Sequence, residues 1–128
     1  MNLLVRMVGL TRMIAFFNLF AGTADKKTEE AVQTVGEWAL SEIRRMAPRG
    51  ARSGYYASTI EGFFSTSSSF GSEYVIGTDE PYGARLEFGF QGVDSLGRRV
   101  SQGPRPHFTP VAAAIPARLI THINQAFS

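Results

Sequence analysis

Hydrophobic residues recur with a helical period over residues 23–47. At about 100° per residue, the apolar side chains gather on one arc: Ala31, Val35, Trp38, Ala39, Ile43 and Met46. The opposite arc is polar, with Lys26, Glu30, Gln33, Glu37, Ser41 and Arg44. Thr23 or Asp25 can cap the start, and Pro48 ends the pattern. The sequence therefore predicts a long helix with one buried face.

A second helical pattern covers residues 109–127. Thr109 and Pro110 form a cap followed by a proline at the first helical position. An apolar stripe follows, made of Val111, Ile115, Leu119, Ile123 and Ala126. Pro116 lies inside it, so we expect the helix to be kinked or divided in two there.

Residues 55–77 are rich in aromatic and β-branched types and predict a β-hairpin with a turn at 67–69. One face would carry Ser58, Ile60, Gly62 and Phe64, and the other Thr59, Glu61 and Phe63. Because this alternation is imperfect, we expect both faces to be partly covered, one by a helix and the other by another subunit.

The first 22 residues contain an apolar run at 13–21. Arg6 and Arg12 are too far apart for the compact basic start of a signal peptide. The run is also shorter than the roughly 20 apolar residues that a membrane span needs. We expect an extended arm or strand at residues 3–7 and a short helix near 10–20.

Residues 82–88 predict one or two helical turns, closed by Gly89. The segment 89–106 then holds four glycines and two prolines, which predicts a long loop. Phe88, Phe90 and Phe108 would anchor its two ends.

The composition of the chain excludes several kinds of functional site. The chain has 128 residues, which suits one domain, and no cysteine, which excludes disulfides, thiolate metal sites and a cysteine nucleophile. The net charge is only +2, but 11 of the 13 basic residues are arginines, which favours contacts with planar acidic groups. Two clusters stand out, Arg44, Arg45, Arg49 and Arg52, and Arg98, Arg99 and Arg105. The first cluster can complement the C-terminal end of a helix, and the second can lie in a solvated loop. Alternatively, either cluster can bind phosphate or a neighbouring subunit.

We find no catalytic or metal-binding motif. Only His107 and His122 are present, and neither has ligand spacing with acidic residues. His122 fits the edge of the core, and His107 fits a hydrogen-bonding role in a loop. Asp79 and Glu80 fit turn chemistry. We therefore expect no enzyme activity, no cofactor and no metal.

Three segments resemble a known ordered pattern. Residues 46–60 resemble a helix-ending A-P-x-x-(T/S)-G-x-L-x-x-S-I signature, residues 82–89 resemble Y-A-x-x-x-E-F-G, and residues 105–112 resemble R-P-F-(L/F)-x-P-A. Together they resemble the tail-component family of long-tailed bacteriophages that is named for the tenth gene product of a lambdoid phage. Tyr55 and Tyr56 stand near a usual aliphatic position, and His107 interrupts the Pro-Phe step.

The resemblance covers about residues 24–127 and implies a small α+β subunit, with a long helix and a C-terminal helix packed on a small antiparallel sheet. It implies a virion ring, sixfold in the usual case, at the head–tail junction: neck, tail-completion or tail-terminator protein. The partners would be further copies, a head connector or stopper, a tail tube or terminator, and genomic DNA bound without sequence specificity, with no membrane. The chain would occupy the host cytoplasm during assembly.

Particular residues fit such a role. Arg98, Arg99 and Arg105 are candidates to face the channel or a neighbour. Candidate subunit contacts are Glu42, Arg49, Arg52, Glu87 and Phe90. Glu42 can instead reach Arg45 within its own helix. Glu87 can accept backbone N–H bonds and brace the root of the loop, and Gly89 can supply a backbone angle that other residues resist.

Two other classes remain open. A small nucleic-acid-binding regulator would need a concentrated basic face, and a small hydrolase or toxin-like enzyme would need a catalytic constellation. The oligomeric state and a DNA-shift experiment distinguish the ring from the regulator.

Overall fold

The computed structural model describes residues 2–8, 12–19, 26–49, 54–67, 71–80, 83–93 and 95–126. The elements in chain order are β1 (Asn2–Val8), β2 (Arg12–Leu19), α1 (Lys26–Met46), α2 (Tyr55–Thr59), β3 (Glu61–Ser67), β4 (Gly71–Thr78), α3 (Gly83–Phe88), β5 (Phe90–Val93), β6 (Arg99–Gln102) and α4 (Thr109–Ala126). Strands β1, β2, β4 and β3 form one antiparallel sheet in that order, and β5 and β6 form a separate hairpin. The predicted α+β class is confirmed.

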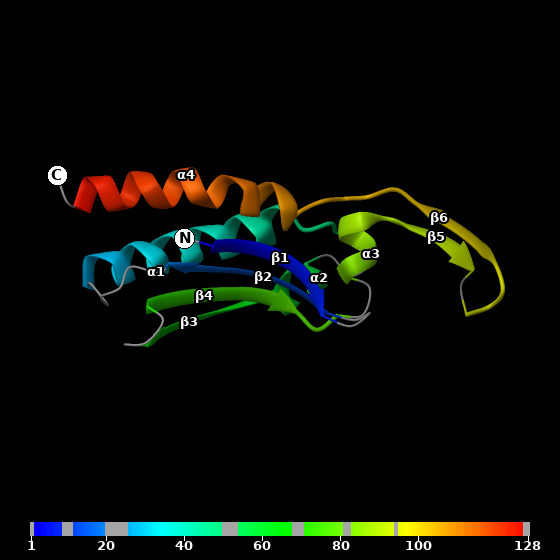
Figure 1. The fold of residues 1–128 in the computed structure, drawn as a ribbon. Coiled ribbons are helices and arrows are strands. Elements are labelled where there is room, and N and C mark those ends of the chain that lie inside the picture. Colours follow the sequence, from blue (N-terminus) through cyan, green and yellow to red (C-terminus); the bar gives the residue numbers. More distant parts are fainter. Residues whose placement is uncertain are drawn as a thin grey trace.

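The two long helices lie on one face of the four-stranded sheet (Figure 1). Helix α1 packs against β3 and β4, and α4 packs against α1 and reaches β1. The core between these layers is apolar and includes Val32, Val35, Ala39, Ile43, Ile60, Ile76, Ile115 and Leu119. Burial of this surface is the main favourable term for the fold.

Helix α1 confirms the predicted amphipathic pattern. Ala31, Val35, Ala39 and Ile43 are buried, whereas the six residues predicted for the polar arc are exposed. Met46 differs, because it lies at the end of the helix and is 37% exposed. The suggested caps Thr23 and Asp25 lie outside the described residues.

A tyrosine ring separates α1 from the sheet. Tyr74 of β4 is buried, and its ring fills the space above two glycines, Gly36 of α1 and Gly62 of β3. A methyl group at position 36 would overlap the ring, and one at position 62 would lie 2.8 Å from it. Both positions therefore require the smallest residue, because the backbones approach the aromatic face too closely for a side chain.

Helix α4 confirms the second helical prediction but is not divided at Pro116. Val111, Ile115 and Leu119 are buried, and Ile123 packs against the core. The stripe anchors both sides of the proline to α1, so tertiary packing offsets the hydrogen bond that the proline removes. The side chain of Ala126 lies outside those described.

The N-terminal segment forms two strands. The strand expected at residues 3–7 is confirmed by β1, but the helix expected near 10–20 is wrong, because residues 12–19 form β2. Strand β2 pairs with β1 on one side and with β4 on the other. Its β-branched and aromatic residues suit a central strand, and long-range pairing with β4 overrides the local helical pattern.

The predicted hairpin at 55–77 is correct only in its second part. Residues 55–59 form the short helix α2, and β3 and β4 form the hairpin after it. Gly54, at φ 81°, precedes α2, and within it the Ser58 and Thr59 hydroxyls donate to the carbonyls of Tyr55 and Tyr56. These local bonds favour the helical turn over an extended strand. The turn was predicted at 67–69, but Ser67 belongs to β3, and residues 68–70 lie outside the described part.

The short helix expected at 82–88 is confirmed by α3. The long loop expected over 89–106 is wrong in its central part, because β5 and β6 pair there with Phe90 opposite Gln102 and Val93 opposite Arg99. Gly92 and Gly97 made the segment resemble a loop, whereas residues along β5 and β6 alternate between half-buried and exposed.

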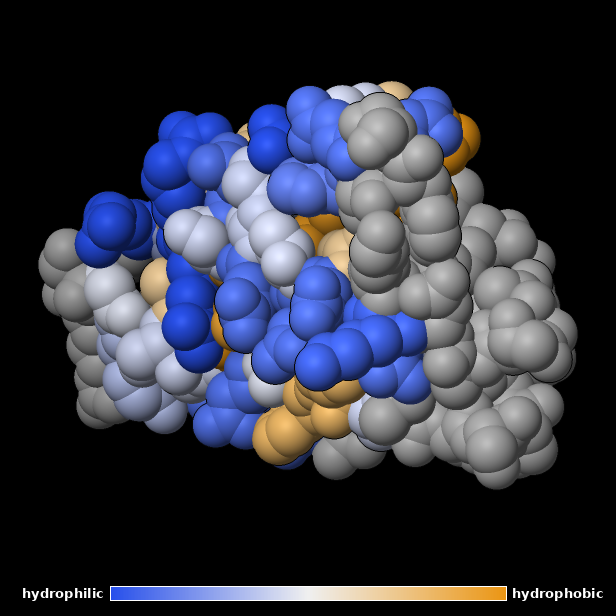
Figure 2. Space-filling model, turned by 90° about the vertical axis from the view of Figure 1, so that its left-hand side faces the viewer, coloured by the Kyte–Doolittle hydropathy of each residue, from blue (hydrophilic) through white to orange (hydrophobic). Residues whose placement is uncertain are grey.

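The end of the molecule at which α1 begins and α4 ends is largely hydrophilic among the described residues, with small hydrophobic areas between polar groups (Figure 2). Among the described helices, none is both long and apolar enough to span a membrane.

Candidate functional site

The β5–β6 hairpin forms an arm that projects beyond the helices and the four-stranded sheet (Figure 1). Its two strands pack mainly against each other. Toward its tip, Val93 is 60% exposed and Leu96 is 73% exposed. Because a two-stranded hairpin is at best marginally stable alone in water, this arm is a candidate for packing against another molecule.

Both ends of the arm are bonded to helix α3. At the first end, the N–H of Gly89 donates to the Arg85 carbonyl over 2.8 Å, and Gly89 has φ 79°. At the second end, the N–H of Arg105 donates to the Leu86 carbonyl over 2.7 Å. Gly89 thus ends α3 in the left-handed conformation, as predicted, and a Cβ there would lie 2.8 Å from the Gln102 carbonyl oxygen. Helix α3 therefore fixes the direction in which the arm leaves the body.

Glu87 joins the arm's root to helix α4. Its Oε1 accepts the backbone N–H groups of His107 at 2.9 Å and Phe108 at 2.8 Å, and its Oε2 accepts that of Thr109 at 3.1 Å. The carboxylate is 2% exposed. It therefore caps the start of α4 from a different helix, where free N–H groups favour a negative charge. The predicted brace is confirmed, and the burial of Glu87 leaves it no outward face for the subunit contact that was also predicted.

The ionisation of Glu87 follows from these contacts. Burial alone raises the pKa of the carboxyl. The N–H groups of His107, Phe108 and Thr109, with the Thr109 hydroxyl, more than offset this effect and hold the pKa below its ordinary value. Glu87 is therefore ionised at neutral pH.

His107 lies beside this carboxylate and is fully buried. Its Nδ1 is 3.0 Å from the Arg105 carbonyl oxygen and 3.2 Å from Glu87 Oε1, and its Nε2 is 2.7 Å from the Tyr56 hydroxyl. Both neighbours of Nδ1 are acceptors, so Nδ1 carries the proton and Nε2 accepts from Tyr56. Burial lowers the pKa of His107, against the opposing effects of Arg105 and Glu87, and favours this neutral form.

The residues Tyr56, Glu87 and His107 form one hydrogen-bonded group, which we call the buried node. Each comes from a different segment of the chain, 54–60, 83–89 and 105–109. Their order resembles a proton relay, but all three side chains are at most 5% exposed, so a substrate has no direct access to them. The node is placed to hold α2, α3 and α4 together. The position of Glu87 before Phe88 and Gly89 predicted its bracing role, but nothing near Tyr56 in the sequence indicates its partner 51 residues away.

The phenylalanines at the root of the arm differ in how far they are buried. Phe108 is fully buried in the core, as predicted for an anchor. Phe88 is 57% exposed, so its predicted anchoring role is wrong, because the final turn of α3 turns it toward solvent. Phe90 is half-buried, and the Arg85 guanidinium lies 3.9 Å from its ring centre. This cation–π contact braces the first strand of the arm from α3.

The arginines of the arm segment are all exposed. Arg98 directly precedes β6, Arg99 is its first residue, and Arg105 lies at the root, where it bonds to α3. The structure thus places two of these candidates on the arm and one at its base, all accessible to a partner.

In the other arginine cluster, Arg44 and Arg45 form contacts within the chain. The Nε of Arg44 donates to the Ile60 carbonyl over 2.9 Å, and Arg45 forms an ion pair with Glu42 at 2.7 Å. The Arg45 hydrogen bond lowers the pKa of Glu42. Glu42 therefore makes the contact within its own helix that the sequence allowed. Arg49 is exposed, and Arg52 lies outside the described residues.

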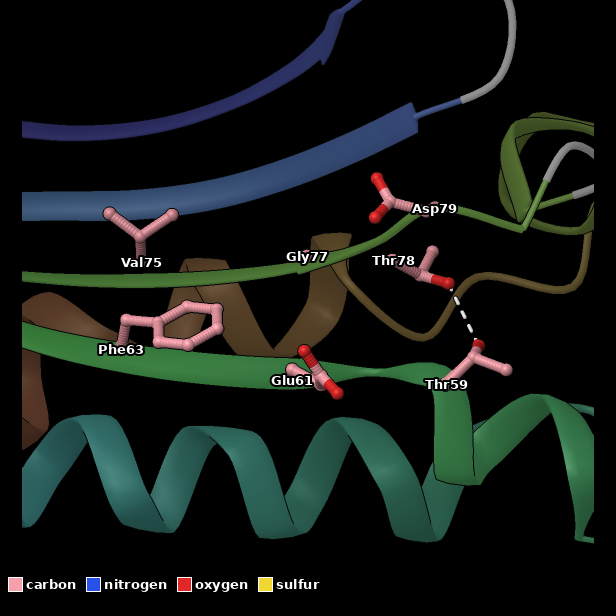
Figure 3. A pocket seen from close by; sticks show the side chains of 7 residues that line it. All are labelled: Thr59, Glu61, Phe63, Val75, Gly77, Thr78 and Asp79. Atoms are coloured by element: carbon pink, nitrogen blue, oxygen red, sulfur yellow. Dashed lines mark hydrogen bonds between the residues drawn. The ribbon is translucent and has the colours of Figure 1, made fainter.

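The helix-free face of β3 and β4 carries a hollow that sequence analysis did not single out. Thr59, Glu61, Phe63, Val75, Gly77, Thr78 and Asp79 surround about 260 Å³ (Figure 3). The predicted alternation did place Thr59, Glu61 and Phe63 on one face. The pairing of Phe63 with Val75 completes the site, and that register depends on tertiary structure.

Within the described parts of the chain, no group of three or more His, Asp or Glu side chains is arranged to hold a metal ion. Comparisons with protein-family models, curated proteins and solved structures gave no match to this chain.

Proposed function

We propose that this chain is a structural protein of a tailed-phage virion, a ring subunit that joins the head connector to the tail tube around the DNA channel. The observation that carries the proposal is the projecting β5–β6 arm. Such an arm supports assembly with neighbours, because its apolar residues are exposed and its strands pair mainly with each other.

The buried node supports the same reading. The three segments that resemble the phage family lie far apart in sequence, and one residue of each enters this node. A mechanical subunit needs an arm held rigidly, and the node with α3 supplies this rigidity at the root. The role is proposed to be mechanical and not enzymatic, with no cofactor.

Contact with DNA in the channel would be to phosphates and independent of sequence. Exposed Arg98 and Arg105 supply suitable donors for such contacts, and exposed Arg99 can serve the channel or a neighbouring copy. Such binding must be weak enough for DNA to move, so it should decline steeply with salt. Sixfold copy number, the position in the virion and assembly in the host cytoplasm belong to the same proposal.

The test is deletion of the coding sequence from the phage that carries it. We expect DNA-filled heads and separate tails in electron micrographs, and joined particles when the purified chain is added. Immunogold labelling should mark the head–tail junction of intact particles. Normal infectious particles that form without this chain would overturn the proposal.

A further inference from the structure

The helix-free face of the β3–β4 hairpin has an exposed apolar centre. Phe63 is 65% exposed and pairs with Val75, and Gly77 leaves the adjacent position open (Figure 3). The hollow of about 260 Å³ at this centre is smaller than the ~300–1,000 Å³ of most small-molecule sites. It suits one or two apolar side chains of a protein partner better than a separate ligand.

The rim of this face is acidic. Glu61 precedes Phe63 on the same side of β3, Glu73 lies on the same side of β4, and Asp79 follows β4 at the edge of the hollow. Glu61 and Glu73 form no ion pair among the described residues. We call this surface, made of Glu61, Phe63, Glu73, Val75, Gly77 and Asp79, the outer face.

The arm carries the complementary groups. Its exposed apolar residues are Val93 and Leu96, and beside them Arg98 and Arg99 are exposed. In the described part of the chain Arg99 has no acidic partner. An apolar tip with arginines matches an apolar hollow with a carboxylate rim in both polarity and charge.

The arm does not cover the outer face of its own chain. It leaves α3 in a direction away from the four-stranded sheet (Figure 1), and its strands pack mainly with each other. A second copy can therefore supply the arm. Two different patches on one subunit make a head-to-tail contact, which closes into a ring when the rotation between copies allows it.

We propose that the β5–β6 arm of one copy docks on the outer face of the next, with the apolar tip at the hollow and Arg99 toward the carboxylate rim. This inference rests on the proposed ring and names the contact that builds it. The arm gains the packing partner that an isolated hairpin needs, and Phe63 is removed from water.

Engineered cysteines test the contact directly, because the chain has no cysteine of its own. Leu96→Cys and Phe63→Cys are made in separate full-length chains, mixed and exposed to mild oxidation. We expect a disulfide between different copies, at least about tenfold faster than for Leu96→Cys mixed with Ile120→Cys. Ile120 is a matched control, since it is an apolar residue of α4 that is 52% exposed. Equal rates for the two mixtures would overturn the inference.

Charge reversal gives a second readout. Arg99→Glu alone should weaken self-association, measured by analytical ultracentrifugation, about tenfold, because it places like charges together. Mixing Arg99→Glu with Glu61→Arg should restore most of the loss. A wild-type chain that remains monomeric at every concentration, or Arg99→Glu that associates like the wild type, would contradict the docking.

Different results would contradict the two proposals. If immunogold labels the head–tail junction but cysteines at positions 96 and 63 form no disulfide, the virion role stands and this interface is wrong. If the disulfide forms and the charge reversal is rescued but no label appears on virions, the interface stands and the virion role is wrong.

Discussion

The hydroxyl of Tyr56 lies 2.7 Å from Nε2 of His107, although 51 positions separate the two residues in the chain. Their rings meet edge to face, with centroids 5.3 Å apart. This contact ties the short helix α2 to the segment that leads from the arm into α4. Among the contacts of the buried node, it joins the residues that are farthest apart in the sequence.

Tyr56→Phe should lower the free energy of unfolding by about 1–2 kcal/mol, because it leaves Nε2 of His107 buried without its donor. Urea denaturation monitored by circular dichroism measures the change. Tyr55→Phe is the adjacent control, since Tyr55 is 42% exposed and its hydroxyl is 3.4 Å from Glu80. Similar losses for both variants would argue against a special role for the buried pair.

Stability should fall as the solution is acidified below about pH 6.5, the ordinary pKa of histidine. Burial lowers the pKa of His107 in the folded chain, so the unfolded chain binds more protons between the two values. Unfolding is therefore favoured as pH falls through that window. Glu87 adds a second loss below about pH 4.5, because its folded pKa is also lowered.

Urea midpoints across pH 3–8 measure both stages. His107→Gln should remove the slope of the first stage while the second remains. A stability that is constant between pH 7 and pH 5, or an unchanged slope in His107→Gln, would contradict the assignment.

Glu87→Gln should lower the free energy of unfolding by about 2 kcal/mol, because a neutral amide cannot accept three backbone N–H groups as a carboxylate does. Hydrogen exchange should quicken at His107, Phe108 and Thr109 before it quickens in the middle of α4. Glu30→Gln removes an exposed charge and serves as the control. Unchanged exchange at these three amides would contradict the proposed cap.

Gly36→Ala should destabilise the chain by about 2 kcal/mol, although alanine is the better helix former by about 1 kcal/mol. The added methyl group would overlap the Tyr74 ring and push α1 from the sheet. Ser41→Ala on the exposed face of α1 should leave stability nearly unchanged or raise it slightly. Thermal unfolding of the two variants, compared with wild type, measures the contrast; a stabilised Gly36→Ala would show that α1 can move without cost.

Local patterns predicted the elements that carry strong periodicity. The apolar arc of α1 and the stripe of α4 were readable because a buried helix face repeats about every 3.6 residues. The bracing role of Glu87 and the helix-ending role of Gly89 could also be predicted, since a carboxylate and a glycine at a helix end have few common roles. These features depend on neighbours close in sequence.

The remaining features depend on distant contacts. Strand β2 gains its partners from β1 and β4, and α2 is favoured by side-chain bonds that compete with an extended chain. The glycines at 92 and 97 made the arm resemble a loop. The hollow beside Phe63 required the register with Val75, and the Tyr56–His107 bond required the whole fold. No single segment contains this information.

The Tyr74 ring sets the spacing between α1 and the sheet, and both Gly36 and Gly62 lie against it. A side chain at position 36 is compatible with the same spacing only if position 74 carries a smaller residue. Among related chains, positions 36 and 74 should therefore covary: a residue larger than glycine at 36 should occur together with a residue smaller than tyrosine at 74.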